Sequence, residues 1–405
     1  MIAEIKAGKA FGSISAPPSK SMAHRLLICA AMSKGISTVR GVSLCDDALA
    51  TIDCLRALGA KIDILDDVCS IEGFDIKNFP PKKELFCRES ASTLRFIIPI
   101  AALLGVEVKF CGAEPLMKRP LSVYADIFKK NGLHFEERDN CIYLKGPLSS
   151  GKYTVSGNVS SQFISGLLFA LPVLDGNSEI TIIPPFESRA YIDLTLQSLK
   201  KFGVTAEFSD EFTITVKGNQ KYTCADLSVE GDYSSAAFCD AFNLLGGNVK
   251  VTGICEHSLQ GDKVYKQLYK KLLTNNAIID VSDCPDLSPI LFALAAALNG
   301  AEFTGTKRLK IKESDRALAM KTELEKLGAD IEIYENSVRV KKCPLHKPNE
   351  MLLGHSDHRI VMSLAVLLSL FGGKIDGAEA VKKSYPSFFE DVKALGIDVK
   401  FREES

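Results

Sequence analysis

The stretch from Ser160 to Gly176, SSQFISGLLFALPVLDG, carries the pattern that decides the fold. Polar residues open it, apolar residues fill about three helical turns, and a glycine closes it. A serine at a helix start accepts hydrogen bonds from free backbone N–H groups, and a glycine at the end adopts the left-handed backbone that stops a helix. The stretch therefore predicts a helix that is buried on nearly all sides.

This pattern occurs six times in the chain. Successive closing glycines are 70, 71, 70, 54 and 72 residues apart. Such a regular interval indicates internal repeats, one of which is short. The other five copies are Ser19 to Gly35, Glu89 to Gly105, Asp232 to Gly246, Asp286 to Gly300 and Ser356 to Gly372.

A second marker recurs at the same interval. It consists of the end of an amphipathic helix, a glycine, and a strand in which apolar and polar residues alternate. A degenerate sixth copy, Leu272 to Val281, has asparagine in place of the glycine. The five clear copies are Arg56 to Ile64, Lys129 to Glu137, Lys200 to Phe208, Glu325 to Ile333 and Lys393 to Phe401.

Each repeat therefore contains a buried helix, an amphipathic helix and several strands. This composition predicts an α/β fold with helices packed inside sheets. Six repeats can form one closed ring, a solenoid, or two domains of three repeats each. A break in the pattern at Glu230 to Tyr233, between the third and fourth repeats, favours two domains.

The charge balance limits what the protein binds. Its 405 residues include 49 Lys and Arg and 50 Asp and Glu, a net charge of −1, which disfavours bulk nucleic acid or an anionic membrane as the main partner. The longest apolar stretches span about a dozen residues, fewer than a membrane helix needs. Neither a signal peptide nor a lipidation motif is recognised, so we expect a cytoplasmic protein whose anion-binding sites are local.

The twelve cysteines show no C-x-x-C spacing, and several lie in apolar helical patterns, among them Cys29, Cys54 and Cys239. We expect reduced core thiols, neither disulfides nor zinc ligands. His355 and His358 are three residues apart, but no further ligand residues accompany them. No metal site is therefore predicted.

Basic side chains stand near the predicted starts of the buried helices, at Lys20, Arg25, Arg95 and Arg359. The free N–H groups of a helix start already carry a partial positive charge. Any one of these residues alone would more typically be a solvated surface charge. Their recurrence in several repeats indicates a polyanionic ligand. Neither a P-loop nor a dinucleotide-binding glycine motif is present.

A set of motifs runs in order along nearly the whole chain. They are Pro18-Ser19-Lys20-Ser21 followed by Arg25, Arg119-Pro120, Ser160-Ser161-Gln162-Phe163, Tyr191-Ile192-Asp193, Gly231-Asp232, Pro285-Asp286, Lys312-Glu313-Ser314-Asp315-Arg316, Asp357-His358-Arg359 and Lys383-Ser384-Tyr385-Pro386. Together they resemble the signatures of the EPSP synthase family.

The resemblance implies a two-domain inside-out α/β barrel, with three βαβαββ repeats and buried helices in each domain. It also implies that residues 18–231 form the N-terminal-type domain, while residues 1–17 join residues 232–405 in the C-terminal-type domain. Crossovers are implied near residues 12–18 and 228–233. This repeat count agrees with the six copies found in the sequence.

The implied reaction transfers the enolpyruvyl group of phosphoenolpyruvate to the 5-hydroxyl of shikimate 3-phosphate and releases phosphate through a tetrahedral intermediate. It belongs to the shikimate pathway, which leads through chorismate to the aromatic amino acids. Neither a cofactor nor a metal is implied. We expect a monomer whose partners are the two small-molecule substrates.

The resemblance also implies site residues. Lys20, Asp286 and Glu313 match the positions that transfer protons, and the division of the two transfers among them stays open. Without the resemblance, Asp286 would be interpreted as a helix N-cap and Glu313 as a surface carboxylate. The implied contacts to shikimate 3-phosphate are Lys20, Ser21, Arg25, Ser160, Ser161, Gln162, Ser188, Tyr191, Asp286 and Lys312. Those to phosphoenolpyruvate are Lys20, Ala91, Arg119, Gln162, Arg316, Arg359 and Lys383.

Three positions depart from the family pattern. Glu89 puts a carboxylate where a neutral donor is usual, and Arg308 stands where asparagine is common near the shikimate hydroxyls. Ala91 replaces a glycine that usually lines the phosphoenolpyruvate site, and its methyl group should shorten the pocket. We therefore expect the inhibitor glyphosate, which is longer than phosphoenolpyruvate, to bind poorly.

Two alternative functions stay open at this point. UDP-N-acetylglucosamine enolpyruvyl transferase shares the implied fold, but it typically has Lys-Asn where this chain has Lys20-Ser21, and the motif of its reactive-cysteine loop is not found. A non-catalytic phosphometabolite-binding protein would not need Lys20, Asp286 and Glu313, all of which are present.

Overall fold

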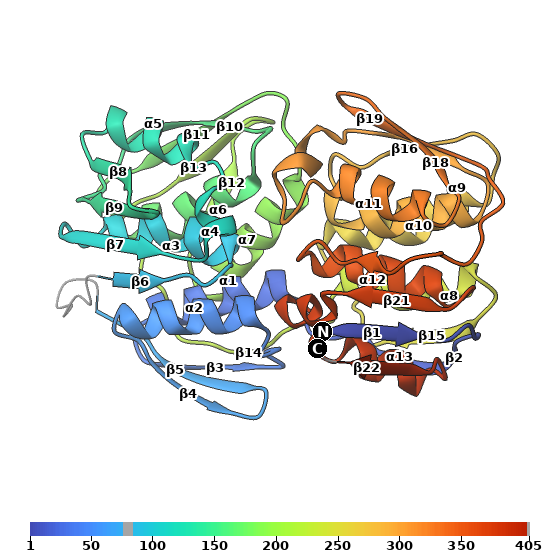
Figure 1. Cartoon of the computed structure of the whole chain (residues 1–405). Coiled ribbons are helices and arrows are strands. Elements are labelled where there is room, and N and C mark those ends of the chain that lie inside the picture. Colours follow the sequence, from blue (N-terminus) through green and yellow to red (C-terminus); the bar gives the residue numbers. More distant parts are fainter. Residues whose placement is uncertain (76–83, 403–405) are drawn as a thin grey trace. The chain divides into compact units, whose positions relative to one another are not determined.

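The computed structural model describes residues 1–75 and 84–402 and contains two compact units (Figure 1). One unit comprises Pro18–Glu230, and the other joins Met1–Pro17 to Gly231–Ser405. The chain therefore passes from one unit to the other at residues 17–18 and 230–231. Both units combine helices with β-sheets, which confirms the predicted α/β fold class.

The unit Pro18–Glu230 contains three four-stranded sheets of one design. The first two strands of each sheet pair in parallel, and the remaining pairs are antiparallel. In sheet order the strands are β14 (Asp226–Ser228), β3 (Ile36–Arg40), β5 (Val68–Glu72) and β4 (Lys61–Leu65); β6 (Glu84–Phe86), β7 (Glu107–Cys111), β9 (Cys141–Lys145) and β8 (His134–Arg138); and β10 (Lys152–Ser156), β11 (Ser178–Ile183), β13 (Thr213–Val216) and β12 (Ala206–Phe208).

Three helices fill the interior of this unit, and nearly all of their side chains are buried: α1 (Lys20–Met32), α3 (Ala91–Ala102) and α6 (Ser161–Ala170). A second set keeps one face toward water: α2 (Asp46–Ala57), α5 (Ser122–Lys130) and α7 (Arg189–Lys201). The described part of the unit also contains two short segments, α4 (Glu114–Met117) and the 3₁₀ turn η1 (Leu171–Val173). The sheets lie outside the buried helices (Figure 1), as the repeat pattern predicts.

The other unit has two four-stranded sheets of the same design. In sheet order they are β16 (Ala277–Asp280), β17 (Ala301–Thr304), β19 (Ser337–Lys341) and β18 (Asp330–Ile333), and β20 (Leu352–Leu353), β21 (Gly373–Asp376), β1 (Ile2–Ile5) and β22 (Val399–Arg402). The N-terminal strand β1 thus completes the sheet of the last repeat. A third sheet consists of β15 (Asn248–Thr252) paired in parallel with β2 (Phe11–Ser15).

The helices of this unit follow the same division. The buried ones are α8 (Tyr233–Leu244), α10 (Ser288–Ala297) and α12 (His358–Leu368). The outer ones are α9 (Tyr265–Leu272), α11 (Arg316–Glu325) and α13 (Phe388–Ala394). Four 3₁₀ turns connect them: η2 (Gly261–Val264), η3 (Pro285–Leu287), η4 (Lys307–Ile311) and η5 (Ala378–Lys383).

The sheet β15–β2 explains the short interval of 54 residues in the repeat pattern. Among the described residues, this sheet lacks the antiparallel strands of the other five sheets. In four of those sheets two of these strands form a hairpin, and in the fifth they are β1 and β22, from the two ends of the chain. The strand after α9, β16, instead pairs in parallel with β17 and opens the next sheet. The strand that follows the degenerate marker at Leu272 to Val281 therefore pairs in parallel with its neighbour. The strands that follow the five clear copies pair antiparallel. Asn276 in this turn adopts a left-handed backbone, with φ of +57°.

Five of the six buried helices begin with a side-chain cap. In each case an oxygen of the capping residue accepts a hydrogen bond from a backbone N–H in the first turn. The sixth helix, α10, begins at Ser288 after η3, and Asp286 lies before it. The interpretation of Asp286 as an N-cap is therefore wrong, because a 3₁₀ turn precedes the helix. The capping residues are Ser19, Ser90, Ser160, Asp232 and Asp357.

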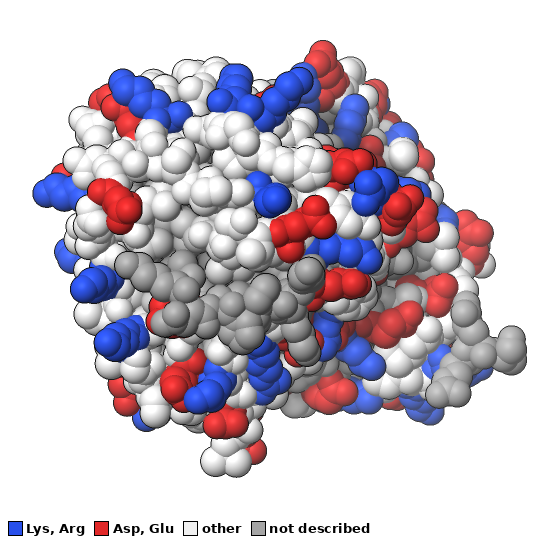
Figure 2. Space-filling model, turned by 90° about the vertical axis from the view of Figure 1, so that its left-hand side faces the viewer, with Lys and Arg blue, Asp and Glu red and all other residues white. Residues whose placement is uncertain are grey.

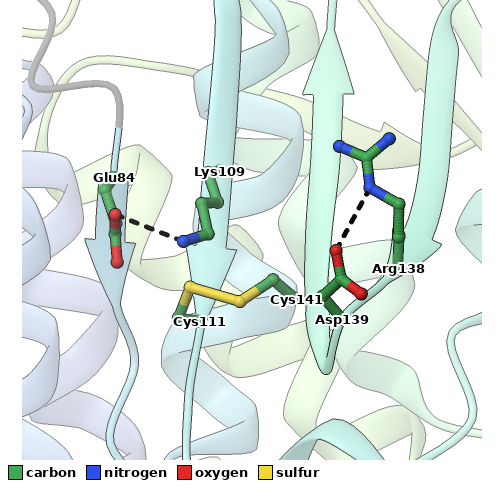
Figure 3. Close-up of a disulfide and its surroundings, with 6 residues drawn as sticks. All are labelled: Glu84, Lys109, Cys111, Arg138, Asp139 and Cys141. Atoms are coloured by element: carbon green, nitrogen blue, oxygen red, sulfur yellow. Dashed lines mark hydrogen bonds and ion pairs between the residues drawn. A yellow bond between two sulfur atoms is a disulfide. The ribbon is translucent and has the colours of Figure 1, made fainter.

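Cys111 and Cys141 form a disulfide between β7 and β9 (Figure 3). The prediction that the cysteines form no disulfide is therefore wrong at this pair. The two residues are 30 positions apart in the sequence, and the antiparallel register places them opposite each other, with Cα atoms 4.8 Å apart. Strand register, which residue spacing does not reveal, decides this pairing. Each of the other ten cysteines is a free thiol, and seven of these are buried.

Acidic and basic side chains are interspersed on the described part of the face drawn in Figure 2. This mixture accords with the small net charge of −1. Across the described residues, we find no helix with the length and the apolar character that crossing a membrane requires.

Candidate active site

A buried arginine gathers three carboxylates in the unit that contains α11. Arg316 is the first residue of α11, and 1% of its side chain is exposed. Its Nε donates to Asp357 Oδ2 at 2.9 Å, its Nη1 to Asp286 Oδ1 at 2.8 Å, and its Nη2 to Glu313 Oε2 at 2.7 Å. A guanidinium group suits this task because its donors lie in one plane with fixed directions. We call these four residues the Arg316 cluster.

Asp286 connects this cluster to a second arginine. Its Oδ2 accepts a hydrogen bond from Nη2 of Arg359 at 2.8 Å, and Lys312 Nζ lies 3.8 Å from its Oδ1. Burial alone would raise the pKa of Asp286, but Arg359, Lys312 and Arg316 together hold that pKa well below its usual range. Asp286 is therefore a carboxylate at neutral pH.

The pKa of Lys312 is also lowered, but here burial is the cause. Burial lowers its pKa to about 8, although Asp286 partly opposes this effect. The ammonium form still predominates at pH 7. The structure thus brings together Asp286, Lys312, Glu313, Arg316 and Arg359, five residues that the sequence analysis assigned to the site.

Asp357 was not assigned to the site, although it belongs to one of the motifs. Its Oδ1 accepts a hydrogen bond from the backbone N–H of Arg359 at 2.9 Å and so caps α12. Its Oδ2 accepts from Arg316 and, at 3.2 Å, from Ser314 Oγ. Ser234, in the first turn of α8, was not predicted as a site residue either. Its Oγ accepts a hydrogen bond from Arg359 Nη1. Its position near a helix start is the only sequence signal that could have indicated it.

In the unit Pro18–Glu230, the predicted site residue Lys20 forms an ion pair with Asp47. Lys20 is the first residue of α1, and its Nζ lies 2.8 Å from Oδ2 of Asp47. Asp47 is the second residue of α2 and is buried. The sequence analysis did not identify Asp47. An acidic residue in the first turn of a helix is common, so it carried little signal.

Arg25 lies one turn further along α1 and is also buried. Its Nε donates to Thr195 Oγ1 at 2.9 Å, its Nη1 to the carbonyl of Ser21 at 2.6 Å, and its Nη2 to the carbonyl of Tyr191 at 2.9 Å. Burial lowers the pKa of Arg25 to about 10, which leaves it charged at neutral pH. Five N–H donors are available on a guanidinium group, so these contacts do not use them all.

Gln162 joins α6 to α3. Its Oε1 accepts a hydrogen bond from Arg95 Nη1 at 2.9 Å, and its Nε2 donates to Ser92 Oγ at 2.9 Å. Arg95 also lies over the ring of Phe163, 4.9 Å from its centre. The Oγ of Ser160 accepts from the backbone N–H of Gln162 at 3.3 Å. Ser160 is therefore a helix cap, whatever else it binds.

The remaining predicted residues lie at the starts or ends of elements. Ala91 and Ser161 are the buried first residues of α3 and α6, and Ser188 precedes α7 with a left-handed φ of +61°. Arg119 follows α4, and Lys383 ends η5. Of the three departures from the family pattern, Glu89 is exposed, while Arg308 is buried and donates to the carbonyl of Ser282.

Each unit therefore places buried or half-buried cations at the starts of helices, where backbone N–H groups add a positive potential. Limited solvent around these cations strengthens their attraction for an anion. The Arg316 cluster adds three carboxylates beside these cations. The fold and these groups define an α/β protein with clustered cations that suit small anions.

Comparisons with known proteins narrow this class. The sequence model of EPSP synthase (3-phosphoshikimate 1-carboxyvinyltransferase) matches residues 6–274 and 269–392. Enzymes named 3-phosphoshikimate 1-carboxyvinyltransferase from Clostridium kluyveri and Clostridium beijerinckii are both 40% identical to this chain, over 413 and 421 residues; the first match covers 96% and the second 97% of each chain. This chain belongs to the EPSP synthase family.

Solved structures show the same fold. An EPSP synthase from Acinetobacter baumannii gives a TM-score of 0.79 at 24% identity, with 99% of this chain and 100% of that chain covered. The enolpyruvyl transferase NikO from Streptomyces tendae gives 0.76 at 14% identity, with 98% of both chains covered. The predicted family and two-domain α/β fold are thus confirmed.

The family also establishes the activity. The chain is a transferase of the shikimate pathway, which moves the enolpyruvyl group of phosphoenolpyruvate to shikimate 3-phosphate. The prediction of this reaction is confirmed. The two alternatives, the glucosamine-nucleotide acceptor and the non-catalytic binding protein, find no support in these relatives.

Proposed function

We propose that Lys20, Asp286 and Glu313 make the two proton transfers of this reaction. A base must take the proton of the 5-hydroxyl, and an acid must protonate the methylene carbon of phosphoenolpyruvate. The observation that carries the proposal is the position of Asp286 between Arg316 and Arg359, at 2.8 Å from each guanidinium group. These arginines keep Asp286 ionised, and an anionic substrate that binds them would loosen their hold and strengthen Asp286 as a base.

Phosphoenolpyruvate is assigned to the cations of each unit. In one unit, Arg316, Arg359 and Lys383 would bind its carboxylate and phosphate groups, and planar guanidinium groups suit such bidentate contacts. In the other unit, Lys20, Arg119 and Gln162 would take part, with Ala91 against the substrate. Arg316 and Arg359 are supported by their burial, which leaves little solvent to screen their charge.

Shikimate 3-phosphate is assigned to a more polar set. Hydroxyl groups donate hydrogen bonds to phosphate, and the lysine supplies charge; the proposed phosphate contacts are Ser160, Ser161, Ser188 and Lys312. Ser21 and Arg25 would bind the carboxylate, and Gln162 and Tyr191 would line the ring. The hydrogen bonds that Arg25 makes to the carbonyls of Ser21 and Tyr191 support grouping these three residues.

The test is the release of inorganic phosphate by purified protein supplied with both substrates and a chelator. We expect the wild type to release phosphate and Lys20→Met to release none. For Asp286→Asn we expect kcat to fall by about 100-fold or more. Asp283→Asn is the matched control, because Asp283 is exposed and lies three residues earlier in the chain. An Asp286→Asn variant with wild-type kcat would show that Asp286 transfers no proton.

We also propose that the enzyme acts as a monomer in the cytoplasm. Ten free cysteines favour a reducing compartment, where thiols persist, and outnumber the single pair Cys111–Cys141, which points the other way. Light scattering of the purified protein and fractionation of cells that express it would test the two statements separately.

A further inference from the structure

A lysine at the start of a helix needs an explanation. Lys20 is the first residue of α1, where the helix dipole disfavours a cation. Its side chain is mostly buried, with 15% exposed, so water compensates this cost only in part. Asp47 supplies the compensation, because its Oδ2 lies 2.8 Å from the lysine Nζ.

Asp47 is itself held firmly. Its side chain is 5% exposed, and it sits in the first turn of α2, which favours a carboxylate. Its backbone carbonyl accepts a hydrogen bond from Thr93 Oγ1 at 3.4 Å. Thr93 Oγ1 also lies 2.7 Å from Thr51 Oγ1 of α2 and 2.8 Å from Ser90 Oγ, the cap of α3. This buried network ties the starts of α2 and α3 together.

The network extends to α1 through a second residue. This residue is His24, which lies one turn after Lys20 in α1. Its Nδ1 lies 2.6 Å from Thr51 Oγ1. Burial lowers the pKa of His24 to about 3, so His24 is neutral at working pH and does not compete with Lys20 for the charge of Asp47. The titratable groups near Lys20 include His24 of α1, Asp47 of α2 and Cys45 just before α2.

We propose that Asp47 is a positioning residue that fixes the ammonium group of Lys20 and keeps it charged. The inference rests on the proposed role of Lys20 in the reaction. A lysine held as an ammonium group by a buried carboxylate serves as a proton donor or as a positive charge toward phosphoenolpyruvate, and is a poor base.

The first test compares Asp47→Asn with Asp46→Asn. Asp46 is the neighbouring residue in the same turn of α2, and it is exposed, so both variants remove one charge from the same helix start. For Asp47→Asn we expect the KM for phosphoenolpyruvate to rise at least tenfold, and the alkaline limb of the kcat/KM profile to move down by about one pH unit or more. Asp46→Asn should match the wild type in both respects.

A purely structural role for Asp47 would lower the thermal midpoint and the yield of folded enzyme without moving the alkaline limb. That outcome would overturn the proposal, as would an unchanged KM together with an unchanged profile.

The second test does not depend on activity. The protein is treated with dilute acetic anhydride at pH 8, which transfers an acetyl group to neutral lysine Nζ and releases acetate. The acetylation rate of Lys20 is measured by mass spectrometry relative to that of exposed Lys34 in the same chain. Only the neutral amine reacts. We therefore expect Lys20 to be acetylated at least five times faster in Asp47→Asn than in the wild type or in Asp46→Asn. Equal rates would overturn the proposal. If Lys20→Met releases phosphate at the wild-type rate, the proposed role of Lys20 fails, and the acetylation rates still decide whether Asp47 controls the charge of Lys20.

Discussion

Asp357 illustrates how one buried side chain serves two parts of the candidate site. One carboxylate oxygen caps α12, the helix that carries Arg359, and the other holds Nε of Arg316 at 2.9 Å. The positions of both arginines therefore depend on a residue that need not contact either substrate. At the residue scale, geometry of this kind separates groups that bind from groups that orient them.

Ala91 leads to a prediction about inhibition. It is the buried first residue of α3, and its methyl group stands where the family usually has glycine. If this methyl group shortens the phosphoenolpyruvate pocket, Ala91→Gly should bind glyphosate at least ten times more tightly, as measured by the inhibition constant. The KM for phosphoenolpyruvate should change less than threefold, which serves as the internal control. Equal glyphosate inhibition of both proteins would contradict the pocket-length argument.

At the scale of elements, Glu323 anchors the loop before α12. This fully buried residue of α11 contacts His355 Nε2 at 2.7 Å, the backbone N–H of Leu353 at 2.9 Å, and Lys326 Nζ at 3.0 Å. His355 and Ser356 have left-handed backbones, with φ of +50° and +52°, a conformation that costs energy for such residues. The contacts of Glu323 offset this cost and hold the loop that leads to the cap of α12.

We expect Glu323→Gln to lower the free energy of unfolding by about 3 kcal/mol at pH 7, because it breaks a buried charged pair. Burial alone would raise the pKa of Glu323, but hydrogen bonds from His355, Leu353 and Lys326 lower it. A lowered pKa gives stability that is present above about pH 4.3 and is lost as the pH falls through the folded-state value. The deficit of the variant should therefore shrink between pH 5 and pH 3.

Urea denaturation across this pH range measures the effect. Glu325→Gln is the matched control, because Glu325 lies on the same helix and pairs with Lys321 in an exposed ion pair. Such pairs contribute about 0.5 kcal/mol, so the control should be close to the wild type. A deficit that stays constant down to pH 3 would contradict the role given to the ionised carboxylate.

At the scale of the whole molecule, ligand binding should stabilise both units. The proposed contacts to shikimate 3-phosphate come from the unit Pro18–Glu230 and from the unit that contains Lys312. At about 100 times its Kd the ligand should add about 2.7 kcal/mol of stability, visible as a rise of a few degrees in the unfolding midpoint. If the two units unfold in separate steps, both midpoints should rise. Shikimate without its phosphate should give a smaller shift, and a rise confined to one step would contradict the assignment of contacts to both units.

Much of the fold could be predicted because the buried helices carry local signals. Ser19, Ser160 and Asp232 mark helix starts through capping chemistry that operates within four residues. The apolar pattern that follows them records burial directly. The short fourth repeat was visible as an interval of 54 residues, but its cause, the missing antiparallel strands, depends on which strands pair.

The candidate site was predictable to a smaller extent. Basic residues at helix starts indicated an anionic ligand, and the motifs indicated Asp286, Glu313 and Arg316. Asp47 resembled an ordinary acidic residue of a helical first turn, and Asp357, although part of a motif, resembled an ordinary N-cap. The importance of each comes from a partner 27 or 41 positions away.

By itself, then, the sequence determined the repeats, the buried helices, the balanced charge and the family of the enzyme, since each of these follows from residue types and their order along the chain and needs no knowledge of which distant residues touch. Only the tertiary structure decided that Asp286 is held by two arginines instead of capping a helix, that Lys20 pairs with Asp47, and that Cys111 faces Cys141. Hydrogen bonds and ion pairs act over about 3 Å in space, and strand register and helix packing bring distant residues within that range.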